Sequence, residues 1–229
     1  MSQRRIKVAL FALCALAILA TLDVGFQALD TLSRLTGIES ERDRWQKPSD
    51  VIAALNLKPG DVVADLGCGS GYFTLKLPSS IGNNGRVLAE DIRRLPLAFL
   101  WFRAFQRGER NVKVVLGDED DPHLPRKGVN EVLIFNTYHE LADPQAILAH
   151  IRDALVAGGR LVVADREPHQ TDQDGGISVE HEVSPDQVQS DLRKAGFEIV
   201  ARQDRFIDRD PYNEQWWMIS GREPQPSPN

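Results

Sequence analysis

Residues 62–74 read Val-Val-Ala-Asp-Leu-Gly-Cys-Gly-Ser-Gly-Tyr-Phe-Thr, and this stretch decides the fold. The apolar run at 62–64 is typical of a buried parallel strand. The glycines at 67, 69 and 71 predict a tight turn, and the apolar residues after them begin a helical pattern. A strand that runs through a glycine-rich turn into a helix predicts a ligand-binding β-turn-α unit.

The glycine spacing indicates the kind of ligand. A dinucleotide-binding loop reads G-x-G-x-x-G and brings backbone N–H groups up to a pyrophosphate. Here the third glycine comes one residue earlier, and Asp65 stands two residues before the first. A carboxylate suits a ligand with a cationic amino-acid end better than one with two phosphates. An NAD-dependent oxidoreductase is therefore only a third alternative.

In this form the loop resembles motif I of the class I S-adenosylmethionine (SAM) methyltransferases. The resemblance implies SAM as cofactor and methyl transfer as activity. It also implies that one group of residues holds the amino-acid end of SAM: Asp65, Gly67, Cys68, Gly69 and Gly71. From its own context, Cys68 is interpreted as a small residue that fits the turn, because reactive cysteines need a specific microenvironment.

Strand and helix patterns alternate through the rest of the chain, which predicts an α/β fold. Within the resemblance, this is a Rossmann-like, doubly wound, mostly parallel seven-stranded sheet. A first helix is expected from Pro48, and Ser184, Pro185 and Gly196 are typical of the ends of the last one. The predicted strands are 61–66, 86–91, 112–117, 130–135, 159–165, 197–204 and 214–221, and the further helices are 71–78, 94–107, 143–156 and 184–195.

Acidic residues end three successive predicted strands. Asp91 follows Asp65 by 26 residues, and Asp118 follows Asp91 by 27, which is one strand-helix unit per step. Ligands of open α/β sheets bind at the carboxyl ends of the strands. The resemblance assigns Asp91, with Ile92 beside it, to the ribose of SAM, and Asp118 with Glu119 to the adenine. A plain solvated acidic loop is the alternative for each.

The fourth strand is followed by Asn136-Thr137-Tyr138-His139-Glu140-Leu141. This segment resembles the loop of type-11-like methyltransferases that faces the transferred methyl group, so Asn136 is expected beside SAM. His139 or Tyr138 is expected to act as the base or to orient the acceptor, and His is the residue type best suited to proton transfer near neutral pH. The alternative is that they only hold the loop. The resemblance covers about residues 45–221.

The composition of the chain argues against several classes of partner. A net charge of −6 argues against a nucleic-acid surface. Two cysteines provide neither a disulfide framework nor a metal motif, and His169 and His181 fit no metal signature. No metal is expected. The partner predicted is a small-molecule or lipid-like methyl acceptor, and the sequence does not specify an oligomeric state.

The N-terminus has the pattern of a signal anchor. Basic residues in 1–7 precede an uncharged apolar run at 8–22, without a convincing cleavage site. The expected organisation is a membrane anchor or signal segment at 1–30, a connector at 31–46, the SAM-binding domain at 47–222 and a Pro-rich disordered tail at 223–229. A helix lying on the membrane surface is the alternative to the anchor.

The expected location of the domain differs between two arguments. The charge rule predicts export, since positive charges precede the apolar run, whereas the supply of SAM favours the cytoplasm. An exported domain would be consistent with a second function, a non-catalytic methyltransferase-like binding or scaffold module at the membrane.

Overall fold

The computed structural model describes residues 30–168 and 182–225. It contains two compact units, Met1–Gln46 and Lys47–Asn229. In the first, residues 30–45 are helical. Ion pairs between Arg34 and Asp30 (2.8 Å) and between Arg44 and Glu41 (3.1 Å) join successive turns of this helix.

The predicted N-terminal anchor, the central part of the 166–183 loop with His169 and His181, and most of the Pro-rich tail lie outside the described residues. Within the described ranges, no helix is both long enough and apolar enough to cross a bilayer.

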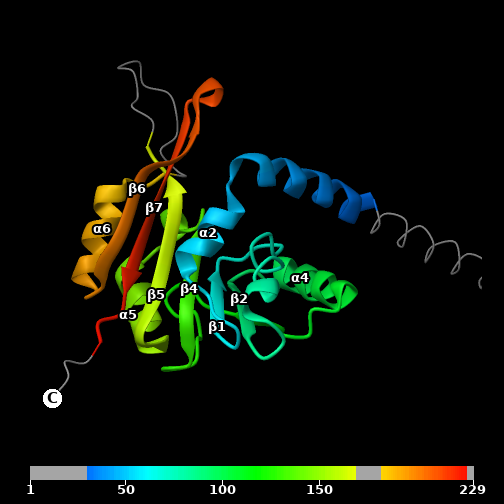
Figure 1. Cartoon of the computed structure of the whole chain (residues 1–229), viewed down its shortest axis with the longest axis horizontal. Coiled ribbons are helices and arrows are strands. Elements are labelled where there is room, and N and C mark those ends of the chain that lie inside the picture. Colours follow the sequence, from blue (N-terminus) through cyan, green and yellow to red (C-terminus); the bar gives the residue numbers. More distant parts are fainter. Residues whose placement is uncertain (1–29, 169–181, 226–229) are drawn as a thin grey trace, which may run out of the picture. The chain divides into compact units, whose positions relative to one another are not determined.

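A seven-stranded sheet runs through the described part of the second unit in the order β3-β2-β1-β4-β5-β7-β6 (Figure 1). β7 is antiparallel to both of its neighbours, and the other pairs are parallel. This confirms the predicted α/β fold. The strands are β1 Val62–Leu66, β2 Arg86–Asp91, β3 Val112–Leu116, β4 Val129–Phe135, β5 Leu155–Arg166, β6 Glu198–Arg209 and β7 Glu214–Arg222.

Helices cover both faces of the sheet. Side chains alternate between the faces of a strand, and in β2 Leu88 belongs to the apolar cluster of α5 and α6, whereas Ala89 belongs to the cluster of α4. α4 therefore lies on the opposite face from α5 and α6. The helices are α2 Pro48–Leu55, α3 Pro78–Ile81, α4 Arg94–Arg107, α5 Pro144–Ala154 and α6 Pro185–Lys194, with short 3-10 turns η1 Tyr138–Glu140 and η2 Asp210–Tyr212.

The predicted helix starts are confirmed where a capping side chain stands before proline. The amide of Ala146 donates to Asp143 at 3.0 Å before α5, and the amide of Gln187 donates to Ser184 at 3.2 Å before α6. Each cap satisfies an N–H group that has no partner inside the helix. α5 and α6 thus begin at the carboxyl end of the parallel strands.

The predicted helix at 71–78 is wrong. Residues 71–76 form consecutive turns, and a regular helix begins only at Pro78. The amide of Lys76 bonds to the carbonyl of Phe73, three residues back, while that of Leu77 bonds four residues back to the same carbonyl. Pro78 has no N–H to continue the pattern. The chain after the glycine loop is therefore wound irregularly.

The predicted tail begins later than residue 223. Glu223 is buried and lies 2.8 Å from the guanidinium of Arg152, and its carbonyl accepts a hydrogen bond from the amide of Gly158. A carboxylate paired in this way is held in the fold, so the domain extends past β7.

Candidate functional site

The glycine loop lies at the carboxyl end of β1, between β2 and β4. Gly67, Gly69 and Gly71 have φ angles of 68°, 53° and 90°, a region that favours glycine. A Cβ atom on Gly67 would collide with Thr137, and one on Gly71 with Leu100, whereas one on Gly69 would meet nothing within 4 Å. Two glycines thus allow close packing, and Gly69 faces open space where a ligand has room.

Both acids at the end of β2 hold this loop. The amide of Gly67 donates to Glu90 Oε2 at 3.3 Å, and the amide of Gly69 donates to Asp91 Oδ2 at 2.9 Å. The two side chains leave the strand on opposite faces and still reach the same turn, because the loop crosses the end of β2. Sequence reasoning favoured Asp91 and did not assign Glu90 a role.

Asp91 lies where the sequence predicts, but its carboxylate already has partners. Its Oδ1 accepts from the backbone amide of Arg93 at 2.8 Å and from Arg93 Nε at 3.1 Å. The Asp91 side chain is 3% exposed and that of Arg93 is 62% exposed. The hydrogen bond to Asp91 raises the pKa of the guanidinium. A ligand group that binds Asp91 must share the carboxylate with Arg93.

The buried acids around the loop change the pKa values of its ionisable groups. Burial, together with the neighbouring Asp91 and Asp65, raises the pKa of Glu90 to about 7, although the hydrogen bond from the amide of Gly67 lowers it. Burial and the same three carboxyl groups also raise the pKa of the Cys68 thiol. Cys68 is therefore a neutral thiol, as its interpretation as a small turn residue predicts.

Asp65 is a buried acid at the end of β1. Its carboxylate accepts a hydrogen bond of 2.5 Å from the hydroxyl of Thr74. This bond ties the end of β1 to the turns at 71–76. The contact of Asp65 with the amino-acid end of SAM stays a prediction.

Ile92, predicted beside the ribose, and the residues predicted for adenine are at the surface beside β2. The amide of Gly117 donates to the carbonyl of Asp91 at 3.3 Å, which sets the end of β3 next to Asp91. Ile92 is 51% exposed, and Asp118 and Glu119 are also exposed. Asp118 Oδ2 lies 3.3 Å from His123 Nε2, an ion pair that the sequence did not suggest.

The loop after β4 contacts the glycine loop from the other side. The hydroxyl of Thr137 donates to the carbonyl of Gly67 at 3.4 Å. Asn136 has a φ angle of 56°, and its amide bonds to the carbonyl of Ala164 at 2.8 Å. Its side-chain Oδ1 is buried and accepts no hydrogen bond from the described residues. Such an oxygen suits a ligand that brings its own donor.

His139 forms a buried pair with Asp165, at the end of β5. His139 Nδ1 lies 2.8 Å from Asp165 Oδ1, and the backbone amide of His139 donates to Oδ2 at 3.2 Å. Both side chains are nearly fully buried. A carboxylate on Nδ1 orients the ring and favours the tautomer whose Nε2 accepts a proton. His139 Nε2 lies 3.6 Å from Glu140 Oε1.

Tyr138, the neighbouring candidate, points away from this site. It is buried in the apolar cluster of α5 and α6, and its hydroxyl donates to Asp191 Oδ2 at 3.3 Å. Burial and Asp191 raise the pKa of this hydroxyl. The structure contradicts the prediction that Tyr138 is a base, because its buried hydroxyl is already bonded to a carboxylate of α6.

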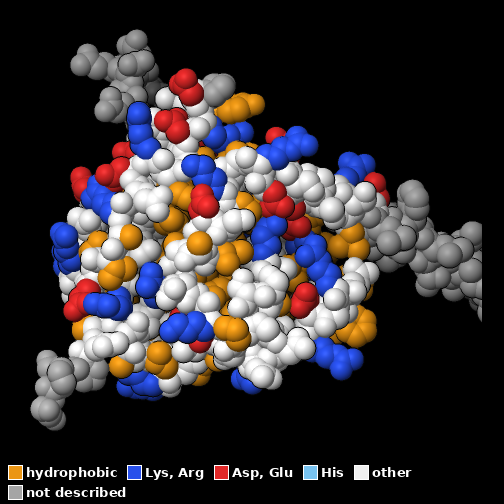
Figure 2. Space-filling view, in the orientation of Figure 1, with side chains coloured by type: hydrophobic (Ala, Val, Ile, Leu, Met, Phe, Trp, Pro, Cys, Tyr) orange, Lys and Arg blue, Asp and Glu red, His pale blue; other side chains and the backbone are white. Residues whose placement is uncertain are grey.

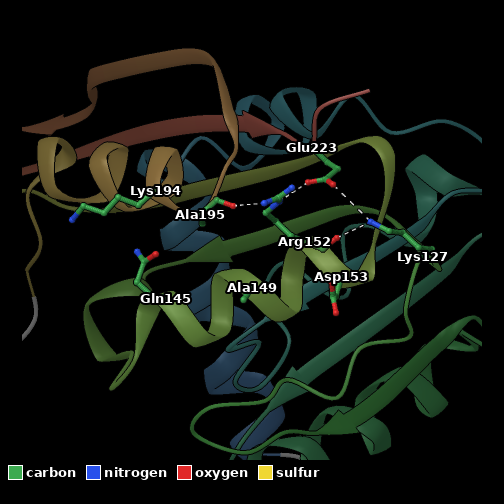
Figure 3. A pocket seen from close by; sticks show the side chains of 8 residues that line it. All are labelled: Lys127, Gln145, Ala149, Arg152, Asp153, Lys194, Ala195 and Glu223. Carbon is green, nitrogen blue, oxygen red and sulfur yellow. Dashed lines mark hydrogen bonds and ion pairs between the residues drawn. The ribbon is translucent and has the colours of Figure 1, made fainter. Parts of the chain in front are cut away.

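A separate cavity of about 460 Å³ lies along α5, from Gln145 at its start to Asp153 near its end, and its Arg152, Lys127 and Glu223 are near the amino end of the parallel strands (Figure 3). Arg152 lies at its centre and donates to Glu223 Oε2 at 2.8 Å and to the carbonyl of Ala195 at 2.7 Å. Lys127 donates to the carbonyl of Arg152 at 3.1 Å. These groups bond to one another and to backbone carbonyls, so the cavity has the character of a structural contact between elements.

The strand order reverses between β1 and β4, and the glycine loop lies at this switch point. This arrangement is typical of α/β proteins that bind a ligand at the carboxyl end of the parallel strands. The comparisons then identify the family. A methyltransferase-domain family matches residues 57–212, more than half of the chain. The chain belongs to this family, as the resemblance of the loop predicts.

Individual relatives are more distant. The chain is 31% identical over 125 residues to a carboxy-S-adenosyl-L-methionine synthase from Dichelobacter nodosus. The matched segment covers 53% of this chain and 52% of the relative. It is 30% identical over 104 residues to an aklanonic acid methyltransferase from a Streptomyces species, with coverage of 44% and 46%. The chain thus spans about half the length of the curated relatives it matches.

Among solved structures, the fold is similar to a SAM-dependent methyltransferase from Aquifex aeolicus. The TM-score is 0.69 at 22% identity, over 83% of this chain and 97% of that one. This likeness concerns the fold.

Proposed function

We propose that this protein transfers the methyl group of SAM to a small-molecule acceptor. The observation that carries the proposal is the glycine loop, which two acids from one strand hold so that Gly69 faces open space. Membership of the methyltransferase-domain family supports the same reaction.

The residues at the loop fit SAM in charge and in hydrogen bonding. The buried Oδ1 of Asn136 suits the ammonium of the amino-acid end. Asp91 is a carboxylate with four acceptor positions, which the amides of Gly69 and Arg93 and the guanidinium of Arg93 occupy. Ribose hydroxyls would take the two positions of the exposed Arg93 guanidinium, while the amide of Gly69 keeps its own. Ile92 and Asp118, exposed beside it, match the apolar face and the amino group of adenine.

When bound, SAM supplies a methyl group on a positively charged sulfur. The protein then has to hold the acceptor in line with that methyl group and to exclude water. If the nucleophilic atom of the acceptor carries a proton, that atom would bond to the methyl carbon as the bond between this carbon and sulfur breaks, and the proton has to leave. His139 Nε2 takes the proton, and Asp165 keeps Nδ1 protonated and the ring oriented.

Two features of the proposal rest on the sequence alone. The apolar run at 8–22 supports association with a membrane, and a membrane address favours a lipid-like acceptor. The side of the membrane is proposed to be cytoplasmic, because SAM is available there. A reporter fused to the C-terminus tests this, and activity of the reporter only in an exported compartment would overturn it.

The reaction is tested with the full chain and methyl-labelled SAM. Fractionated small-molecule and lipid extracts are the acceptors, and transfer of label to one fraction is expected. His139→Gln should reduce this transfer while SAM binding, measured by calorimetry, is kept. Absence of SAM binding by the folded protein would overturn the proposal.

A further inference from the structure

Helix α4 carries large apolar side chains on two faces. On the inner face, Leu97 and Leu100 pack with Ala89 of the sheet. On the outer face, Leu95 is 85% exposed, Phe105 72% and Trp101 59%. Soluble domains rarely expose large apolar side chains together unless the patch contacts something. α4 therefore has an outer face that the rest of the described chain leaves open.

The outer apolar residues form one continuous surface. At about 100° per residue, Leu95, Trp101, Phe102 and Phe105 fall within an arc of roughly 120° on the helix. The rings of Trp101 and Phe105 are stacked, with centroids 5.9 Å apart. A groove of about 340 Å³ continues from this face toward β3, lined by Arg94, Leu97, Ala98, Trp101, Val114 and Leu116.

The charge of this region is opposite to that of the whole protein. α4 contains no acid, although the chain has a net charge of −6. Its Arg94 and Arg107 are exposed, whereas Arg103 is buried and donates to the carbonyl of Ser70. Arg110 and Lys113 add exposed cations after α4, beside the acid Glu109, and Arg93 before α4 is paired with Asp91. The exposed acids at 118–120 follow Leu116, at the edge of the groove. In the space-filling view, hydrophobic side chains and Lys or Arg side chains lie together over α4 (Figure 2).

We propose that the outer face of α4 docks on a lipid bilayer that contains anionic lipids. Exposed Trp, Phe and Leu beside Arg are the composition of helices that lie in the membrane interface. The cations complement anionic headgroups, which the otherwise acidic protein would repel. A protein partner or a second copy would not by itself call for this clustering of cations.

The position of α4 gives the docking a consequence. The helix begins three residues after Asp91, whose carboxylate binds the amide of Gly69. The bilayer surface would therefore lie next to the glycine loop, within reach of an acceptor dissolved in it. The apolar run at 8–22 would be a second contact, and stable membrane binding generally takes two such signals. The docking does not depend on methyl transfer.

The test is the fluorescence of Trp101 in the full-length protein on vesicles of phosphatidylcholine and phosphatidylglycerol. The Trp101 contribution is the difference between wild type and Trp101→Phe, a change that keeps the surface apolar. Brominated acyl chains should quench about half or more of this contribution, and its emission should shift to the blue. Phe105→Asp should abolish the quenching, because a charge enters the centre of the face.

Tyr212→Asp is the matched control, since Tyr212 is a similarly exposed aromatic residue (68%) outside α4. In this variant the brominated lipids should quench the Trp101 fluorescence as strongly as in wild type. Vesicles of phosphatidylcholine alone should quench Trp101 several-fold less. The proposal is overturned if the protein floats with the vesicles and Trp101 is not quenched, or if neutral vesicles quench it equally. It is also overturned if Phe105→Asp only converts a dimer to a monomer in sedimentation.

Discussion

The two ends of the parallel strands differ in how their charges are balanced. At the amino end, the cations Arg152 and Lys127 and the anion Glu223 bond to one another and to nearby carbonyls. At the carboxyl end, the acids Glu90 and Asp91 gather beneath a loop whose Gly69 is open. Groups of opposite charge therefore pair at the amino end, whereas acids lie together at the carboxyl end beside the open space at Gly69. A cavity alone does not locate the ligand, and the grouping of acids beside open space favours the carboxyl end.

The largest effect is expected at the carboxyl end from Asp165→Asn. The amide can no longer favour a proton on His139 Nδ1, so kcat should fall about 10²-fold or more while the SAM dissociation constant changes little. Steady-state kinetics and calorimetry measure the two. Asp191→Asn, which alters the partner of Tyr138, is the control, and an equal loss of kcat there would refute the role of Asp165.

At the amino end, Arg152→Met should reduce stability and leave SAM affinity unchanged. It removes the ion pair with Glu223 at 2.8 Å and the bond to the carbonyl of Ala195. Because Arg152 is partly exposed, the loss of unfolding free energy should be about 1–2 kcal/mol, below that of a fully buried pair. Urea unfolding measures it. Glu223→Gln alone should lower the unfolding free energy by a similar amount. The double variant should lose less than the sum of the two single losses.

The comparison also predicts a pH dependence. The pKa of Glu90 is raised to about 7 by burial, above the ordinary value of 4.5. The folded state thus binds this proton more tightly than the unfolded state. The contribution of this proton to the free energy of unfolding is full below about pH 4.5 and is lost as the pH rises to about 7. Glu90→Gln should make stability less dependent on pH over this range and raise it at pH 8 by about 1–2 kcal/mol.

Glu131 is the matched acid at the amino end. Burial, with Asp61, raises its pKa to about 8. Glu131→Gln should change the pH dependence of stability in the same direction, but not that of SAM binding. Thermal unfolding and calorimetry between about pH 5 and 8 separate the two acids. If Glu131→Gln altered the pH dependence of SAM binding, the two ends would not be independent.

The smallest effect is expected from Arg93→Ala. This change frees the two acceptor positions of Asp91 that the guanidinium of Arg93 occupies, while the backbone amide of residue 93 keeps its bond to Oδ1. It also removes a cation beside SAM, which is itself cationic. SAM affinity should rise, by about tenfold or less. Arg94→Ala, at the next position, which is also exposed, is the control. A large loss of affinity in Arg93→Ala would show that the guanidinium contacts the ligand instead.

Much of this architecture could be predicted from local sequence. The strands are apolar runs between turn residues, and Asp143 and Ser184 cap helices just before proline, so each pattern depends on neighbours in the chain. The irregular turns at 71–76 could not be predicted, because Gly71 packs against Leu100 of a different element.

The site was predicted less completely than the fold. Asp91 and His139 lie where strand ends predict, but the partner of His139 is 26 residues away in the sequence and is brought to it by the pairing of β4 with β5. Asp165 does end a strand, so the signal that identified Asp91 would have found it. The different partners of Tyr138 and His139, Asp191 and Asp165, follow from tertiary packing, which the sequence of adjacent residues does not reveal.

The central claim, that the open side of the glycine loop binds SAM, is tested most directly by calorimetry on Gly69→Ala and Gly108→Ala. Both glycines have positive φ angles, 53° and 72°, and at both an added Cβ meets nothing within 4 Å. Both variants should therefore lose stability by about 1 kcal/mol. Gly69→Ala should weaken SAM binding tenfold or more, and Gly108→Ala, at the far end of α4, should bind SAM as wild type does. Equal SAM affinity in the two variants would contradict the claim.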